Sequence, residues 1–146
     1  MARPSNATLR KLSDSDQTID GPANDIRGRV VKDKNGKAIG KVHDLLIDDA
    51  EDKVRFLIVD HGGFLGFGET RSFIPVDAIT RITDEDVHID HSGEHVADAP
   101  QYDPDLVDDH SYHSSIYSHY GYRPYWEAGY TYPSELAMLA MGAGQV

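Results

Sequence analysis

Short apolar runs separated by turn signals fill the chain from Ile26 to Asp90. Residues 29–32 and 38–48 flank the sequence Asp-Lys-Asn-Gly, which is typical of a hairpin turn. No long helical period interrupts the later apolar runs, at residues 53–60, 71–76, 79–83 and 87–90. The pattern predicts an all-β fold, a small β-barrel of five to six short antiparallel strands, and disfavours βαβ units.

The spacing within these runs adds detail. Residues 38–48 break strict alternation once, which indicates a β-bulge near His43. In residues 53–60 only Arg55 interrupts the outward apolar positions, so we expect both faces of that strand to be partly covered. Pro75 lacks an N–H and therefore needs an edge or a strand end. The predicted core takes apolar positions from every run: Val30, Ile39, Val42, Leu45, Ile47, Val54, Phe56, Ile58, Ile74, Val76, Ile79, Val87 and Ile89.

Composition excludes several classes of protein. The 146 residues suit one domain with appendages, and the absence of cysteine rules out disulfides, thiolate metal sites and cysteine nucleophiles. A net charge of -11 makes nucleic acid an unlikely partner, because such binding relies on clustered Lys and Arg. No run reaches the about 20 apolar residues of a membrane helix, and the N-terminus lacks an apolar signal core. We therefore expect a cytoplasmic protein without membrane insertion.

The ordered motifs of this region resemble a PRC-barrel domain. They are the hairpin GKAIGKVHDLLID, the strand VRFLIVD and the strand-and-turn FIPVDAI, within about 65 residues. The family is named for the cytoplasmic domain of the photosynthetic reaction centre H subunit and includes the C-terminal domain of the ribosome maturation factor RimM. The stretches APQYDPDLVDD and YGYRPYW resemble tails of actinobacterial single-domain PRC-barrel proteins. The resemblance implies a small β-barrel that binds or organises other macromolecules, and it implies no reaction.

Two arms flank the predicted barrel domain, which spans residues 25–97. The N-terminal arm, residues 1–24, is polar, and a short helical turn is one interpretation of Leu9 to Leu12. The C-terminal arm, residues 98–146, contains all eight tyrosines and the only tryptophan. Six acids and one base, Arg123, lie between residue 102 and the end of the chain.

The C-terminal arm contains two candidate helices. Residues 105–120 predict a helix that ends at Gly121 and carries Tyr112, Ile116 and Tyr120 on one face. Asp108 or Asp109 lies near its expected start. A second short helix is predicted at residues 135–141.

The glycine-rich loop at residues 62–68 invites comparison with a phosphate-binding loop. Such a loop opens a helix, whereas this one leads into a strand and no Walker lysine follows. We interpret it as a structural connection whose Phe64, Leu65 and Phe67 form a candidate protein-contact tip.

Eight histidines raise the question of a metal site. They include two sequence groups, neither of which follows a tight ligand motif: His88, His91 and His95, and then His110, His113 and His119. We interpret these side chains as solvated or paired with tyrosines, with a weak zinc or nickel site in the tail as the alternative.

No pattern of acids or nucleophiles assembles an active site. Asp48, Asp49, Glu51 and Asp52 lack the EF-hand order and indicate a solvated turn. The G-x-S-x-G elbow of serine hydrolases is absent. We assign no catalytic residue, cofactor or metal ligand and expect a protein that is not an enzyme.

Three interpretations of the tyrosine-rich arm remain open. It wraps its own barrel, crosses to another subunit, or acts as a free segment that contacts other partners. We expect a homodimer and an additional protein partner with a basic surface, which would suit the acidic chain. The candidate interface residues are Phe64, Leu65, Phe67, Tyr117, Tyr120, Tyr122, Tyr125 and Trp126. An adaptor in RNA or ribosome maturation and an accessory of an electron-transfer complex are alternatives implied by the family.

Overall fold

The computed structural model describes residues 9–11, 25–48, 53–61, 71–100, 103, 105 and 109–132. The elements follow in the order β1 (Leu9–Lys11), β2 (Val30–Lys32), β3 (Ala38–Asp48), β4 (Lys53–Asp60), β5 (Arg71–Pro75), η4 (Val76–Ala78), β6 (Ile79–Ile82), β7 (Asp86–Ile89), α1 (Gly93–Ala97) and α2 (His110–Tyr120). Three features of the sequence analysis lie outside the described residues. They are the glycine-rich loop with Phe64, Leu65 and Phe67, the acids Asp49, Glu51 and Asp52, and the predicted helix at 135–141.

The described strands form one mixed sheet of seven strands, in the order β5-β4-β3-β2-β7-β6 with β1 also paired to β3. The all-β class is therefore confirmed, but the expected five to six antiparallel strands are corrected. The pair β2–β7 is parallel, whereas the other pairs are antiparallel. A parallel pair joins strands far apart in sequence, so no local turn signal announces it.

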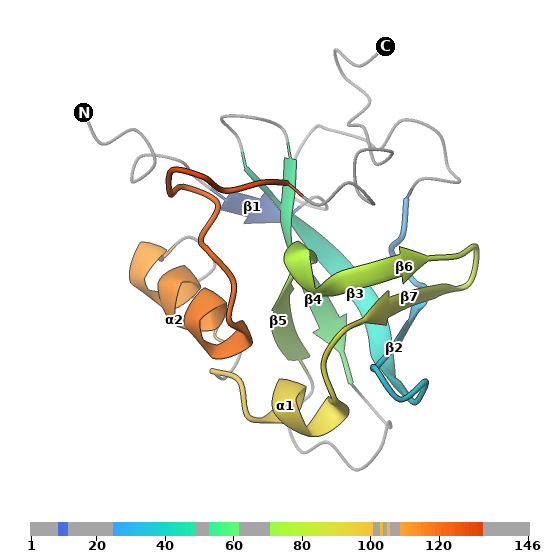
Figure 1. The fold of residues 1–146 in the computed structure, drawn as a ribbon. Coiled ribbons are helices and arrows are strands. Elements are labelled where there is room, and N and C mark those ends of the chain that lie inside the picture. Colours follow the sequence, from blue (N-terminus) through green and yellow to red (C-terminus); the bar gives the residue numbers. More distant parts are fainter. Residues whose placement is uncertain are drawn as a thin grey trace.

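The path of the sheet is not closed among the described residues, since β5 and β6 are its two ends. These two strands are nevertheless consecutive in the chain, and η4 joins them directly. Pro75, the last residue of β5, has φ -60° and lies at the strand end that its missing N–H requires. In Figure 1 the β6–β7 hairpin lies across β3 and β4, so the sheet curls around its core.

The long strand β3 organises the sheet. Its first half pairs with β2 and its last residues pair with β1, while β4 follows it on the other side. The register shifts between Val42 and Asp44, which confirms the bulge predicted near His43. The helical turn considered near Leu9 is wrong, because Leu9–Lys11 forms strand β1 and buries Leu9 against the core.

The Asp-Lys-Asn-Gly hairpin turn is also confirmed. Gly36 adopts φ 82°, and its N–H donates to the carbonyl of Asp33. The Asp33 carboxylate is buried and accepts from the N–H groups of Asn35 and Lys37, and from that of Gly93. Asp33 therefore fastens the turn to α1, a helix that the sequence analysis missed.

The core contains all but one of the predicted residues. Val30 is only half-buried, because it lies opposite Lys41 and Asp86 on the outer face, and Val31 points inward instead. Both faces of β4 are buried, as its sequence indicates. The core also includes residues that the sequence analysis did not assign to it, among them Leu9, Ile26, Leu46, Leu57, Val59, Phe73 and Val96.

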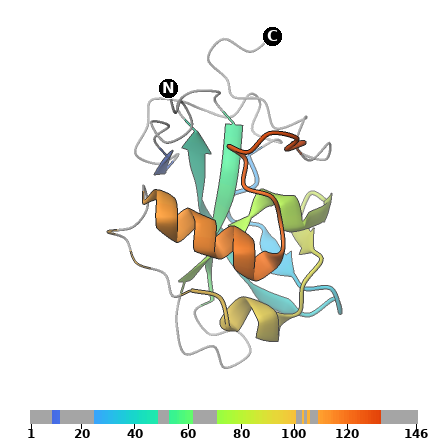
Figure 2. The same ribbon diagram turned by 60° about the vertical axis from the view of Figure 1, so that its left-hand side comes forward.

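Two elements cover this sheet. Figure 2 shows α2 running across the face that includes β4 and β5, with α1 at one end. The predicted helix is confirmed but begins later than residue 105, at His110, because the Asp109 side chain caps it by accepting from the Tyr112 N–H at 2.9 Å. Gly121 ends it in the left-handed conformation with φ 83°, as predicted.

Gly40 provides a test of how closely β3 and β4 approach. A Cβ at this position would lie 2.6 Å from the Asp60 carbonyl oxygen and 2.8 Å from Val59 Cγ1. The carbonyl belongs to the backbone and cannot rotate away. Gly40→Ala should therefore lower the free energy of unfolding, measured by urea denaturation, by about 1–3 kcal/mol.

The matched control is Gly36→Asn in the hairpin turn. No atom lies within 4 Å of the added Cβ there, and asparagine tolerates the positive φ of 82°. Equal losses of stability in the two variants would contradict the close-approach explanation.

Candidate protein-interaction surface

Helix α2 lays an aromatic inner layer on the sheet. Its buried side chains are Tyr112, His113, Ile116, Tyr117 and Tyr120. The Tyr117 ring lies 5.1 Å from that of Phe56, and Tyr112 meets Phe73 edge-on at 5.4 Å. The predicted helix face is thus confirmed, and the described part of the arm packs against the sheet of its own chain.

The chain after Gly121 forms a second, partly exposed layer, which we call the aromatic strap (residues 122–132). Its aromatic side chains are half-buried, each with one side against the protein: Tyr122, Tyr125, Trp126, Tyr130 and Tyr132. Trp126 meets the ring of Tyr117 edge-on at 5.8 Å and that of Tyr125 at 5.1 Å. The His110 ring lies 3.9 Å from that of Trp126, with 38° between the two planes. The strap is therefore ordered by contacts with α2 and with the sheet.

Arg55 fixes the far end of the strap. It lies between Val54 and Phe56, where the register of β3 and β4 shifts, so a β-bulge aims its side chain at the strap. Its guanidinium lies 4.2 Å from the Tyr125 ring centroid and within cation–π range of Tyr130 and Tyr132, at 5.8 and 5.5 Å. The Tyr132 hydroxyl donates to the Val54 carbonyl at 3.1 Å.

Arg55 also forms a buried ion pair with Asp48. Its Nη2 lies 3.0 Å from Asp48 Oδ2, and the two side chains are 3% and 2% exposed. The interpretation of Asp48 as part of a solvated turn is therefore wrong. The sequence signal that points to this pair is Arg55 itself, the single charge in the otherwise apolar run Val54 to Val59.

Several ionisable groups lie under the strap, where burial shifts the pKa of each toward its neutral form. Burial raises the pKa of Asp77, although the nearby Tyr130 hydroxyl and Arg55 oppose the shift. Burial also raises the pKa of Tyr132 to about 12 and that of Tyr117 further. Asp77 Oδ1 and Tyr117 Oη have no hydrogen-bond partner among the described residues. At neutral pH these phenols are uncharged, and the partly exposed Tyr132 contributes apolar area to the surface.

The histidines are distributed differently from their sequence groups. His91, His95 and His119 come together in one stack, and His91 Nε2 lies 2.9 Å from the Tyr122 hydroxyl. The predicted pairing of histidine with tyrosine is therefore confirmed for His91. His113 is buried against Phe56. No group of three His, Asp or Glu residues in the described part of the chain is arranged to hold a metal ion.

His61, immediately after β4, is a buried residue that sequence reasoning missed. Its Nδ1 lies 2.7 Å from the Ile39 carbonyl and its Nε2 lies 2.8 Å from the Ser72 hydroxyl. Burial lowers its pKa, so the neutral ring donates from Nδ1 and accepts from Ser72. This side chain joins β3 to β5 and has a structural role.

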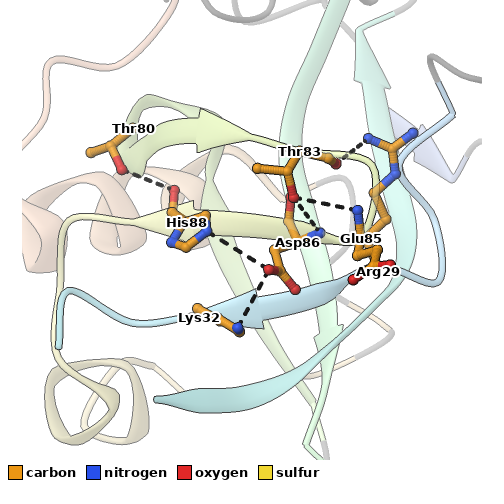
Figure 3. A network of polar contacts seen from close by, with 7 residues as sticks. All are labelled: Arg29, Lys32, Thr80, Thr83, Glu85, Asp86 and His88. Carbon is orange, nitrogen blue, oxygen red and sulfur yellow. Dashed lines mark hydrogen bonds and ion pairs between the residues drawn. The ribbon is translucent and has the colours of Figure 1, made fainter. Parts of the chain in front are cut away.

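A cluster of polar contacts lies on the outer face of β2, β7 and β6 (Figure 3). Asp86 Oδ2 lies 3.4 Å from Lys32 Nζ and 3.9 Å from His88 Nε2. Arg29 Nη1 donates a hydrogen bond to the Thr83 carbonyl at 2.8 Å. His88 points away from the core, as predicted. Because Lys32 on β2 and Asp86 on β7 carry opposite charges, this cluster supports the parallel pairing of the two strands.

The predicted interface residues of the arm thus fall into two groups. Tyr117 and Tyr120 are buried within this chain, at 0% and 4% exposure, so they lie in the inner layer and not on the surface. Tyr122, Tyr125 and Trp126 lie in the aromatic strap and are partly exposed. Sequence reasoning missed the contribution of Tyr130 and Tyr132 to the same surface.

The Arg55–Asp48 pair can be tested by a double-mutant cycle. Arg55→Met should lower the free energy of unfolding by about 3–5 kcal/mol, because it removes one partner of a buried ion pair. Arg55→Met combined with Asp48→Leu should recover a large part of that loss, since both charges are then removed. Urea denaturation measures both, and a double variant as unstable as the sum of the single variants would contradict the coupling.

Comparisons with known proteins place this geometry in a family. The model of the PRC-barrel domain family matches residues 22–96, just over half of the chain. The match covers strands β2 to β7 and most of α1, and it ends before α2 and the aromatic strap. No curated protein matches the chain. No helix in the described residues is long and apolar enough to cross a membrane. The chain belongs to the PRC-barrel domain family.

Proposed function

We propose that this PRC-barrel protein is a non-enzymatic interaction module that forms a homodimer and contacts a further protein. The observation that supports this proposal is the aromatic strap, where five large aromatic side chains each keep one side exposed. Tyrosine and tryptophan in such positions provide most of the binding energy in many protein interfaces.

The chemistry around the strap also fits a protein partner. Its phenols are neutral at physiological pH, and burial raises the pKa of Tyr122 and of Tyr132 further, to about 12. Acidic side chains flank the strap, with Glu127 exposed within it and Asp109 at the start of α2. A partner with a basic surface would complement these charges.

The homodimer is the specific form of this proposal that we favour. A twofold axis places the same patch on both subunits, and an aromatic patch with polar tips can pair with a copy of itself. The arm does not need to cross between subunits for this, because its inner layer already packs on its own sheet. The two family-derived alternatives, in ribosome maturation and in electron transfer, rest on the family alone.

Sedimentation velocity over a wide range of protein concentration tests the homodimer. The full chain has a mass of 16.2 kDa, so we expect a species of twice that mass. Thr131→Arg places a bulky charge at an exposed position between Tyr130 and Tyr132 and should shift the protein toward the monomer.

Asn35→Arg is the matched control, because it adds the same charge at an exposed position in the β2–β3 turn. It should leave the dimer unchanged. A wild-type chain that stays monomeric at every concentration would refute the homodimer. A dimer that Thr131→Arg leaves intact would show that the strap is not its interface.

A further inference from the structure

Three histidine rings form a stack where α2 turns into the aromatic strap. His95 and His119 lie 4.1 Å apart with 14° between their planes, and His91 stacks on the other side of His95 at 5.0 Å and 13°. The Tyr120 ring is nearly perpendicular to all three rings, at centroid distances of 5.0–5.5 Å. The stack therefore joins the end of β7 and α1 to the end of α2.

Reciprocal hydrogen bonds hold the central pair in place. His95 Nε2 lies 3.0 Å from the His119 carbonyl, and His119 Nε2 lies 2.8 Å from the His95 carbonyl. A carbonyl accepts only, so each ring donates its Nε2–H to the backbone of the other helix. Together with the bond between His91 and Tyr122, these contacts fasten the corner at Gly121 onto α1.

The charges around His91 do little to favour its protonated form. Asp90, at the end of β7, favours the charged form of His91, whereas Lys34 in the β2–β3 turn and the other two histidines oppose it. From α1, Glu94 and Asp98 are exposed, and from α2 and the strap the facing groups are the neutral phenols of Tyr120 and Tyr122. Burial is the largest effect and lowers the pKa of His91 below its ordinary value of 6.5.

We propose that His91, His95 and His119 form an acid-sensitive latch: protonation of the stack releases the corner between α2 and the strap from α1 and uncovers Tyr120. Two or three like charges at ring distances of 4–5 Å repel one another in this partly buried site. The proposal concerns how the arm is held, and it does not depend on the homodimer.

The sign of the effect follows from proton linkage. A histidine whose pKa is lower in the folded protein binds its proton more readily in the released state. The latch is therefore fully closed above pH 6.5 and opens as the pH falls below this value. Each pH unit by which the stack depresses one pKa corresponds to a tenfold change in the closed-to-open ratio.

Amide hydrogen exchange of the full chain measures the latch directly. The N–H groups of Gly121 and Tyr122 both donate to the Tyr117 carbonyl, at 2.8 and 3.0 Å, so their exchange reports opening of the corner. After correction for the intrinsic exchange rate, we expect their protection to fall about tenfold or more between pH 7.5 and pH 5.5. Protection of Leu57 and Val59 in β4 should remain unchanged.

Substitution by glutamine separates titration from hydrogen bonding. A glutamine amide can occupy the place of Nε2 and donate to the same carbonyl without gaining a charge. His95→Gln together with His119→Gln should reduce the pH-dependent loss of protection at Gly121, because the charge repulsion within the stack is removed while the burial of His91 remains. His113→Gln, in the inner layer of the same helix, and His88→Gln, on the outer face, should retain it.

A second variant keeps the proposal testable if the latch of the double variant is already open at neutral pH. His91→Phe removes the ring whose pKa is lowered and leaves the reciprocal pair intact, so the loss of protection at low pH should become smaller. The proposal is overturned if protection at Gly121 does not depend on pH in the wild type. It is also overturned if both variants show the wild-type dependence, or if β4 loses protection together with the corner.

Discussion

The structure depends on one constraint, which is that strand β4 cannot expose either of its faces to water. Every residue from Val54 to Val59 is buried, and that run includes a charged side chain. A sheet made only of the strands would leave one face of β4 uncovered. Full burial of a large apolar side chain is worth about 1.5–3 kcal/mol, so covering Phe56 and Phe73 with Tyr117 and Tyr112 is a substantial part of the stability of the domain. The arm is therefore a layer of the fold.

Local features of the sequence predicted local features of the fold. The Asp-Lys-Asn-Gly turn, the bulge at His43, the strand at 53–60 and the caps of α2 each depend on a few neighbouring residues, and each is observed. Other features depend on residues far apart in the chain. They are the parallel β2–β7 pair, the pairing of Leu9–Lys11 with β3 and the inward orientation of Val31. Periodicity carries no information about such partners.

For the candidate site, the sequence correctly pointed to Tyr122, Tyr125 and Trp126 as partly exposed residues. It also placed Tyr117 and Tyr120 on the surface, where the structure buries them. An amphipathic pattern does not show how much of a helix is covered by a second layer of the chain.

The chemistry of Arg55 explains why this junction uses arginine and tyrosine. A guanidinium is planar, so it can stack on the Tyr125 ring at 4.2 Å while it hydrogen-bonds to Asp48 at 3.0 Å. Lysine offers a point charge without a flat face. Tyrosine likewise combines a ring for the cation with a hydroxyl that reaches a backbone acceptor, as Tyr132 does at Val54. The acidic chain therefore uses a buried cation to fasten an aromatic segment that has only one base of its own.

The two attachments of the strap respond to acid in opposite directions. At the Gly121 corner, the pKa of His91 is lowered, so stability from that group is present above pH 6.5 and is lost as the pH falls. At the far end, the pKa of Asp77 is raised above its ordinary value of 3.8, so folding favours its protonated form and stability from that group grows as the pH falls. Arg55 keeps its charge throughout this range. Acid thus weakens the corner while the contacts at Arg55 persist, and the strap opens from the end next to α2 and stays fixed to β4 at the other.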